Sequence, residues 1–341
     1  MTVVAPMLFL CAAFSAGRDL PSGAQTAHFI GCCDASATVA VTDDLFVMAN
    51  DEDNILRVYS WKRLGAPVAT SDLTAFLNPG RKSPEVDIEA AARIGDRIYW
   101  ISSHGRNAKG KERLSRHRFF ATTMAATNGA VRLKPAGNFY AGLLKDLDAD
   151  PRFKPFSLAR AAQWAPKIEG ALNIEGLAAT PQGHLLIGFR NPIPRGQALV
   201  VRLLNPGEVI FGRAPRFGDP ILLDLGGLGV RSIEFCHHRG YVIVGGASDG
   251  RPGSRLFEWS GNGAPTPLLQ RGWSFLNPEA VAVFGAAGSE QLLLLSDDGT
   301  LQIRGQDCKK LKDPDLKRFR AISVPLAYLE QDPVPGTALL E

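Results

Sequence analysis

Residues 173–191 read NIEGLAATPQGHLLIGFRN, and this stretch decides the fold. It begins with a polar residue and a glutamate, continues through small and apolar residues to a Pro-Gln-Gly turn, and ends in a dense apolar run. Its opening pattern recurs four more times, as Asp34-Ala-Ser36-Ala, Asp87-Ile-Glu89-Ala, Ser232-Ile-Glu234-Phe and Asn277-Pro-Glu279-Ala. A strand unit that recurs along a chain is typical of radial or stacked β architectures.

Each opening is followed by a turn and two further kinds of strand. Short, continuously apolar runs indicate strands that are covered on both faces, and they lie at residues 45–49, 97–101, 184–188, 241–245 and 291–295. Segments with more alternation are typical of half-exposed strands, and they lie at residues 55–59, 118–122, 198–202, 255–259 and 300–304. The three kinds of strand match the inner, middle and outer strands of a propeller blade.

The spacing of the units predicts the number of blades. The aligned third positions, from Ser36 to Glu279, are 53, 86, 59 and 45 residues apart. Propeller blades of roughly 40 to 50 residues fit these intervals, except for the second. Its excess falls in residues 137–167, where short helical patterns are interrupted by Pro151 and Pro155. We therefore predict an all-β propeller of five blades with a helical insertion at 137–167; a sixth blade could lie in the first 30 residues or in the insertion.

Composition indicates one large domain. The 35 glycines and 23 prolines are spread along all 341 residues, which suits many tight turns, and no linker divides the chain. We predict a single propeller domain over residues 29–341. Residues 1–28 form a separate segment, in which Met7–Ala16 resembles the apolar part of a signal peptide although no Lys or Arg precedes it. Export and the cytoplasm both stay open, and the cytoplasm is slightly favoured.

Charge and cysteine content exclude some classes of partner. A net charge of +4 is too mild to indicate nucleic-acid binding, and no apolar run reaches the ~20 residues that span a bilayer. The basic residues between His104 and Arg118 form either a solvated loop or an anion-binding loop.

Five cysteines without a Cys-x-x-Cys motif argue against a zinc ribbon or a disulfide framework, so Cys32 and Cys33 are expected to be buried or free. We expect a monomer that binds a small anionic ligand.

The recurring carboxylates predict the position of a site. In an up-and-down blade, the start of the inner strand lies beside the end of the middle strand, so the glutamates and the polar residues about 14 positions later should share one channel mouth. Converging carboxylates repel one another unless a cation or arginines compensate. A ring of oxygen ligands suits Ca²⁺, Mg²⁺ or Mn²⁺ rather than zinc. The predicted metal ligands are Glu89, Glu175, Glu234 and Glu279.

Three further residues at the same mouth are candidates for catalysis. His104 could act as a general base or as a metal ligand, although a histidine in a surface loop can also have no such role. Arg106 and Arg190 could hold an anionic group in bidentate fashion. Each glutamate could alternatively be a solvated channel residue or be hydrogen-bonded to the neighbouring blade.

Several strings resemble an uncharacterised bacterial family that is catalogued only as a domain of unknown function and is thought to be propeller-like. They are residues 34–37, 50–59, 87–91, 103–107, 116–120, 173–177 and 188–192, so the resemblance covers most of the chain from about Phe29 onward. More distantly, Asn173-Ile-Glu175-Gly-Leu177 is similar to the Glu-Gly-Leu start of blades in phytase-like esterases. The channel carboxylates resemble those of regucalcin and gluconolactonase propellers, and that resemblance implies a divalent metal. Ser36 and Ser232 depart from the pattern.

Two functions of different classes follow from this site. The first is a propeller that binds a divalent cation and hydrolyses an anionic ester, phosphoester or lactone, with His104 or a free carboxylate taking the proton. The second is a non-catalytic propeller that presents this face to a protein or ligand. Propellers host both functions, so the fold does not separate them.

Overall fold

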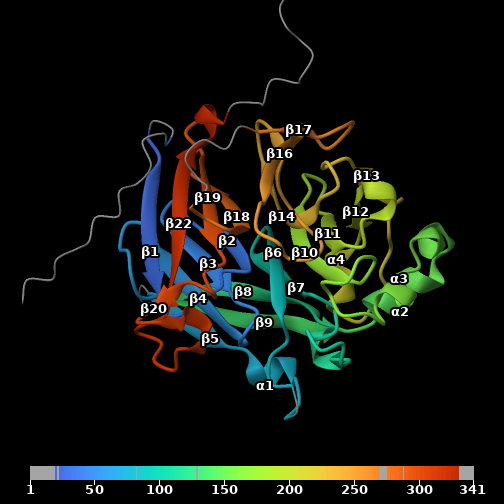
Figure 1. The fold of residues 1–341 in the computed structure, drawn as a ribbon, viewed down its shortest axis with the longest axis horizontal. Coiled ribbons are helices and arrows are strands. Elements are labelled where there is room, and N and C mark those ends of the chain that lie inside the picture. Colours follow the sequence, from blue (N-terminus) through green and yellow to red (C-terminus); the bar gives the residue numbers. More distant parts are fainter. Residues whose placement is uncertain are drawn as a thin grey trace, which may run out of the picture.

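The computed structural model describes residues 20, 23–81, 83–127, 130–268, 275–286 and 288–329. Five four-stranded antiparallel sheets surround a central axis, as Figure 1 shows. The innermost strands β2, β6, β10, β14 and β18 contact one another around the ring, which closes between β18 and β2. The predicted five-bladed β-propeller is confirmed.

The first four blades are continuous in sequence. Blade one contains β2 (Ala37–Ala40), β3 (Leu45–Ala49), β4 (Ile55–Ser60) and β5 (Ala69–Asp72), followed by α1 (Thr74–Leu77). Blade two contains β6 (Ile88–Ile94), β7 (Arg97–Ser102), β8 (Phe119–Thr127) and β9 (Ala130–Tyr140), with the 3₁₀ turn η1 (Leu114–Arg116) before β8. Blade three contains β10 (Asn173–Ala179), β11 (Leu185–Asn191), β12 (Ala198–Leu203) and β13 (Ile221–Leu223), with η3 (Pro194–Gly196) and α4 (Pro206–Val209) in its loops. Blade four contains β14 (Gly229–Cys236), β15 (Gly240–Gly246), β16 (Arg255–Trp259) and β17 (Thr266–Pro267).

Blade five joins both ends of the described chain. Its first two strands are β18 (Pro278–Phe284) and β19 (Gln291–Ser296), its third is β22 (Arg318–Pro325), and its outermost strand is β1 (Gln25–Ile30). All six residues of β1 pair with β22. The N-terminal strand therefore completes the fifth blade, and among the described residues it leaves no sixth blade. The propeller starts at Gln25, a few residues before the expected boundary at 29; the apolar stretch Met7–Ala16 lies outside the described residues.

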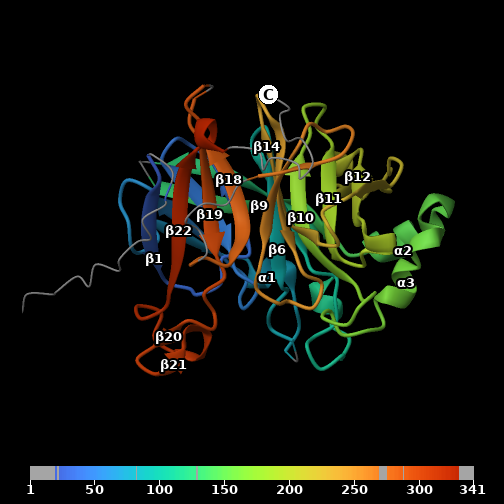
Figure 2. The ribbon, with the colours of Figure 1, turned by 45° about the horizontal axis from the view of Figure 1, so that its top comes forward.

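The loop between β19 and β22 corrects two predictions. Residues 300–304 were expected to form the third strand of blade five, but they lie in a small hairpin of β20 (Gln302–Ile303) and β21 (Gln306–Asp307), followed by η4 (Cys308–Lys310). Figure 2 shows this hairpin extending beyond the end of the sheet. Cys308 forms a disulfide with Cys33, 275 residues earlier. Cys33 is therefore not free, and an odd number of cysteines did not exclude a disulfide.

The core consists of layers between neighbouring blades. The middle strands are apolar on both faces because each face packs against the adjacent blade; for example, Val47 of blade one and Trp100 of blade two share one buried cluster. The insertion before blade three contains α2 (Leu143–Ala149), η2 (Pro151–Phe156) and α3 (Leu158–Ala161), and its apolar side chains extend the layer between blades two and three. The last turn is η5 (Leu326–Tyr328). Among the described residues, no helix is long and apolar enough to cross a membrane.

Candidate functional site

Four of the five inner strands have the same irregularity at the same place. The pairing with the middle strand shifts register between Ile88 and Ala90, and corresponding shifts occur in blades three, four and five. A β-bulge of this kind leaves one extra residue unpaired and re-aims its side chain. The bulged residues are Glu89, Glu175, Arg231 and Glu279. In blade one, Ser36 directly precedes β2.

The three bulged glutamates form the centre of the site. One carboxylate oxygen of each lies within 4.8 Å of an oxygen of the other two, and all three residues are buried. In the third blade, the close packing depends on Gly176, because a Cβ there would lie 2.6 Å from Cγ1 of Val230. The structure thus brings together three of the four predicted glutamates, from blades that are up to 190 residues apart in sequence.

Glu234 does not join this cluster. It pairs with Val242 in the body of β14 and β15, three residues further along the inner strand than the bulge, a displacement of about 10 Å. The bulged residue of blade four is Arg231, so the sequence alignment of this unit was three residues out of register. The spacing to the middle strand could have revealed this difference. Five residues separate Glu234 from β15, whereas seven and nine separate the bulged glutamate from the middle strand in blades two and three.

Two buried arginines neutralise one side of the cluster. Nη2 of Arg231 lies 3.0 Å from Oε1 of Glu279 and 3.3 Å from Oδ2 of Asp297, and its Nε lies 3.9 Å from Oε2 of Glu175. Arg190 donates a short hydrogen bond to Oε1 of Glu175 and donates through Nε to the carbonyl of Ala247 at 2.9 Å. The second oxygen of Glu175 is buried and accepts no hydrogen bond from the residues that the structure describes.

Compensation on the other side of the cluster is indirect, because Arg116 acts on Glu89 through its charge but forms its ion pairs with Glu85 and Asp87. No hydrogen bond or ion pair reaches the Glu89 side chain from the residues that the structure describes, and Oδ1 of Asp51 is buried without a partner. Burial, together with the neighbouring carboxylates, raises the pKa of Glu89 and that of Asp51 well above their usual values. Burial also raises the pKa of Glu279, to about 7, although Arg231 acts in the opposite direction. The channel therefore contains more carboxylates than its arginines neutralise.

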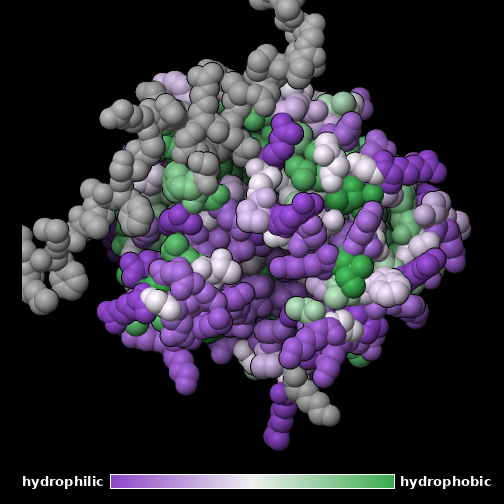
Figure 3. Space-filling model, in the orientation of Figure 1, coloured by the Kyte–Doolittle hydropathy of each residue, from purple (hydrophilic) through white to green (hydrophobic). Residues whose placement is uncertain are grey.

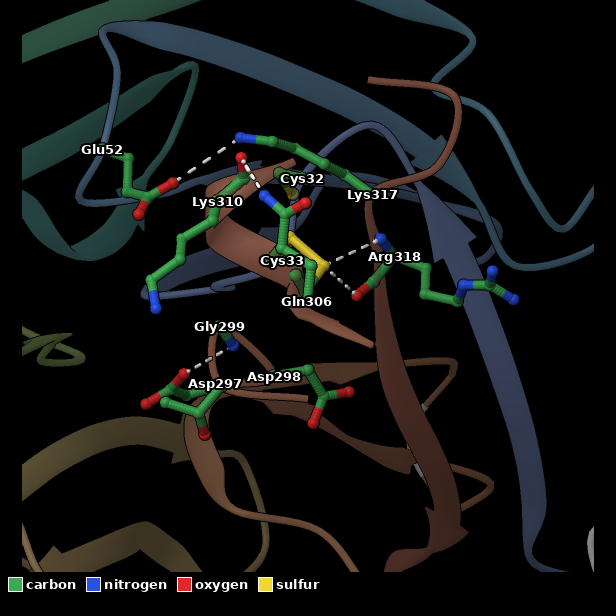
Figure 4. Close-up of a disulfide and its surroundings, with 12 residues drawn as sticks. Cys32, Cys33, Glu52, Asp297, Asp298, Gly299, Gln306, Lys310, Lys317 and Arg318 are labelled. Carbon is green, nitrogen blue, oxygen red and sulfur yellow. Dashed lines mark hydrogen bonds and ion pairs between the residues drawn. A yellow bond between two sulfur atoms is a disulfide. The ribbon is translucent and has the colours of Figure 1, made fainter. Parts of the chain in front are cut away.

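The disulfide lies near Asp297 and Asp298 at the start of the loop after β19 (Figure 4). Asp34 follows Cys33 directly and forms a β-bridge with Asp297, and the amide of Asp298 donates to the Cys33 carbonyl at 3.0 Å. We call residues 297–312 the closing loop. Burial and a hydrogen bond with Asp297 raise the pKa of Asp34 to about 10. Asp297 is one of the polar residues expected at the mouth about 14 positions or more after a recurring glutamate, but neither Asp34 nor Asp297 was predicted as a metal ligand or a catalytic residue.

His104 and Arg106 form their contacts with residues other than the clustered glutamates. The His104 ring is buried, with Nδ1 2.8 Å from the Ser102 carbonyl, and it stacks on His117. Burial, with His117 nearby, lowers the pKa of His104 to about 3, so the ring is neutral at physiological pH. Arg106 donates to the carbonyls of Ala162 and Gly110. Neither side chain contacts a channel carboxylate in the part of the chain that the structure describes.

The segment after α3 borders the mouth. Nδ2 of Asn191, at the end of β11, donates to the carbonyls of Pro166 and Ile168 at 3.1 and 2.7 Å. In the basic loop, Arg116 is held by Asp87 and Glu85, at 2.8 and 2.7 Å. Figure 3 shows one face of the molecule, on which hydrophilic residues predominate around the centre.

These features define the class: a five-bladed β-propeller with a buried acidic cluster in its channel. A family model described as "Protein of unknown function (DUF3616)" matches residues 121–267, less than half of the chain, and confirms the resemblance to a domain of unknown function there. No curated protein matches the chain by sequence.

Solved structures share the fold. The major allergen Mala s 1 of Malassezia sympodialis superposes with a TM-score of 0.50 at 10% identity, covering 89% of this chain and 95% of that one. The glutaminyl cyclase of Myxococcus xanthus gives 0.45 at 12% identity, with 91% and 97% covered. The PQQ-bound aldose sugar dehydrogenase of Streptomyces coelicolor gives 0.42 at 13% identity, with 89% and 99% covered. At these identities the likeness concerns the fold alone.

Proposed function

We propose that the channel binds a divalent cation through Glu89, Glu175 and Glu279. The observation that supports this most is the excess of negative charge: three buried glutamates share a space less than 5 Å across, and Oε2 of Glu175 accepts no hydrogen bond from the described residues. Buried carboxylates without a partner are costly, and a cation with oxygen ligands offsets that cost. Among such cations we propose Ca²⁺, Mg²⁺ or Mn²⁺, because no sulfur or imidazole ligand belongs to the cluster.

We further propose that the site hydrolyses an ester, phosphoester or lactone. A bound divalent cation would polarise the carbonyl or phosphoryl oxygen and lower the pKa of a bound water. Asp51 is better suited than His104 to hold or accept the proton, because its Oδ1 is buried, has no hydrogen-bond partner among the described residues, and lies near enough to Glu89 and Glu279 for their charges to act on one another. Because Arg190 donates a hydrogen bond to Glu175, we propose that it holds this glutamate in position and does not bind an anionic substrate.

A non-catalytic binding propeller is the second candidate. The observation that favours it is the engagement of the arginines, since Glu175 and Glu279 already have ion-pair partners in Arg190 and Arg231. In this reading the channel residues stabilise the ring, and the ligand binds at the mouth.

Metal content and a hydrolase screen separate the two functions. We expect purified protein to contain close to one equivalent of a divalent metal, Glu89→Gln to lose most of it, and Glu234→Gln to retain it as the matched control outside the cluster. Activity in an esterase, phosphatase and lactonase screen should be lower for Glu89→Gln than for wild type. Wild-type protein should lose this activity on treatment with a chelator and regain it when the metal is added back. Metal-free protein that gains no metal on dialysis would support the binding module instead.

A further inference from the structure

Arg231 occupies the ring position at which three other blades place a glutamate. The register shift between Val230 and Ser232 corresponds to the shifts around Glu89, Glu175 and Glu279. A bulge aims its extra side chain at the same place in each blade. The fourth blade therefore directs a positive charge into the space toward which the other bulges direct negative charge.

The Arg231 guanidinium contacts the oxygens that a cation would need. It lies 3.0 Å from Oε1 of Glu279 and 3.9 Å from Oε2 of Glu175, the oxygen that accepts no hydrogen bond. Both glutamates belong to the cluster proposed as the cation site. The side chain is 5% exposed, so water screens its charge weakly.

Arg231 also has an anchor outside the cluster. Asp297 accepts from Nη2 at 3.3 Å and is itself held by the amide of Gly299 at 3.1 Å and by Nδ2 of Asn277 at 3.3 Å. In Figure 4, Asp297 and Gly299 lie beside the disulfide-bonded part of the closing loop. Nε of Arg231 donates no hydrogen bond within the described part of the chain, so part of the guanidinium is unsatisfied in this arrangement. Arg231 can therefore keep one carboxylate partner while it loses the other two.

We propose that Arg231 is a built-in competitor of the cation, and that the channel alternates between a guanidinium-filled and a cation-filled state. This inference rests on the proposed cation site. A divalent cation at Glu175 and Glu279 repels the guanidinium, which then keeps Asp297 and turns toward the channel. Arg231 thus weakens cation affinity, and only in the cation-filled state is it free to bind an anionic group of a ligand.

The test compares cation binding in three variants by calorimetric titration of chelator-treated protein with MnCl₂ and CaCl₂. Arg231→Gln removes the competitor and should bind at least tenfold more tightly than wild type. Arg231→Lys keeps the charge and should stay within about threefold of wild type. Arg57→Gln is the matched control, because it removes another buried cation, whose ion-pair partner Asp53 lies outside the glutamate cluster; it should also stay within threefold.

The outcomes separate this inference from the proposed function. Tighter cation binding by Arg231→Gln alone supports the inference that Arg231 competes with the cation. If wild type binds no cation and Arg231→Gln does, the inference is still supported, but the proposed function fails. Equal binding by wild type and Arg231→Gln overturns the competition and leaves the proposed function standing, while no binding by either overturns both. Equal tightening by Arg57→Gln also overturns the inference, because the gain in affinity would then come from the loss of any buried positive charge. If Arg231→Gln is insoluble when made without added cation, 10 mM MnCl₂ during purification should rescue it, and failure to rescue counts against the inference.

Discussion

At the scale of single residues, the identity of the bulged side chain decides what the channel can bind. Glu89, Glu175 and Glu279 place carboxylates in one buried space, and Arg231 adds a guanidinium to it. Glu234 has the same sequence neighbourhood but lies in the regular part of its strand. A motif read from sequence finds the residue types, whereas the bulge determines which of them reach the axis.

Glu234 provides a prediction about pH. Burial raises its pKa from 4.5 to about 8, so between these values the folded protein binds a proton that the unfolded chain does not. This contribution to stability is complete below pH 4.5 and is lost as pH rises toward 8. Glu234→Gln should therefore stabilise the protein at pH 8.5 relative to wild type, by on the order of 2–4 kcal/mol, and much less at pH 5. Urea unfolding at both pH values measures it; equal effects would contradict the assigned environment.

Gly176 provides a prediction about packing. An added Cβ would lie 2.6 Å from Cγ1 of Val230 and 3.1 Å from Cα of Gly188, so a neighbouring blade must move. We expect Gly176→Ala to cost about 1–3 kcal/mol in unfolding free energy, as overpacking of a well-packed core does. Gly207→Ala is the control, because its Cβ would meet only side-chain atoms at 3.5 Å. Equal Tm values for the two variants would show that blades three and four do not pack as described.

At the scale of elements, the sequence predicted the strands better than their assignment to blades. Middle strands were recognisable because burial on both faces requires continuous apolar runs, as in Leu292–Leu295. The short strand at Gln302–Ile303 was misplaced in the fifth blade, because two alternating residues beside a turn fit an outer strand as well as a hairpin. The pairing of β1 with β22 joins residues about 300 apart and leaves no local signal.

The disulfide links the two sides of the ring closure. Cys33 follows β1, and Cys308 lies in the closing loop between β19 and β22. A cross-link over a sequence separation of 275 residues removes much chain entropy from the unfolded state. We expect Cys308→Ser to reduce the unfolding free energy by roughly 2–5 kcal/mol.

Cys236→Ser is the matched control for this variant, because Cys236 is a buried free thiol. Mass spectrometry under non-reducing conditions should find wild-type protein two mass units lighter than its reduced form. Disulfides of this kind are typical of proteins that mature in oxidising compartments. Fully reduced protein from such a compartment, or a Cys308→Ser variant as stable as wild type, would contradict the bond.

At the scale of the whole molecule, the propeller and the region of the site were predictable from repetition. The recurring openings indicated five units, and the geometry of antiparallel strands indicated that their polar starts converge. The pairing of Arg231 with Glu175 and Glu279, and the contribution of Asp34 and Asp297, required the structure. These contacts depend on bulges and on the closing loop, which follow from the tertiary packing of blades and not from any single unit.

The measurement that tests the central claim most directly is the thermal unfolding of chelator-treated protein with and without 1 mM Ca²⁺, Mg²⁺ or Mn²⁺. A ligand that binds only the folded state and is present at 100 times its Kd adds about 2.7 kcal/mol of stability, which corresponds to a Tm increase of about 4 °C for a protein of this size. We predict that increase with at least one of the three cations for wild type and for Glu234→Gln, and its loss in Glu89→Gln. An unchanged Tm for wild type with all three cations, or an equal increase in Glu89→Gln, would contradict a cation site at the bulged glutamates.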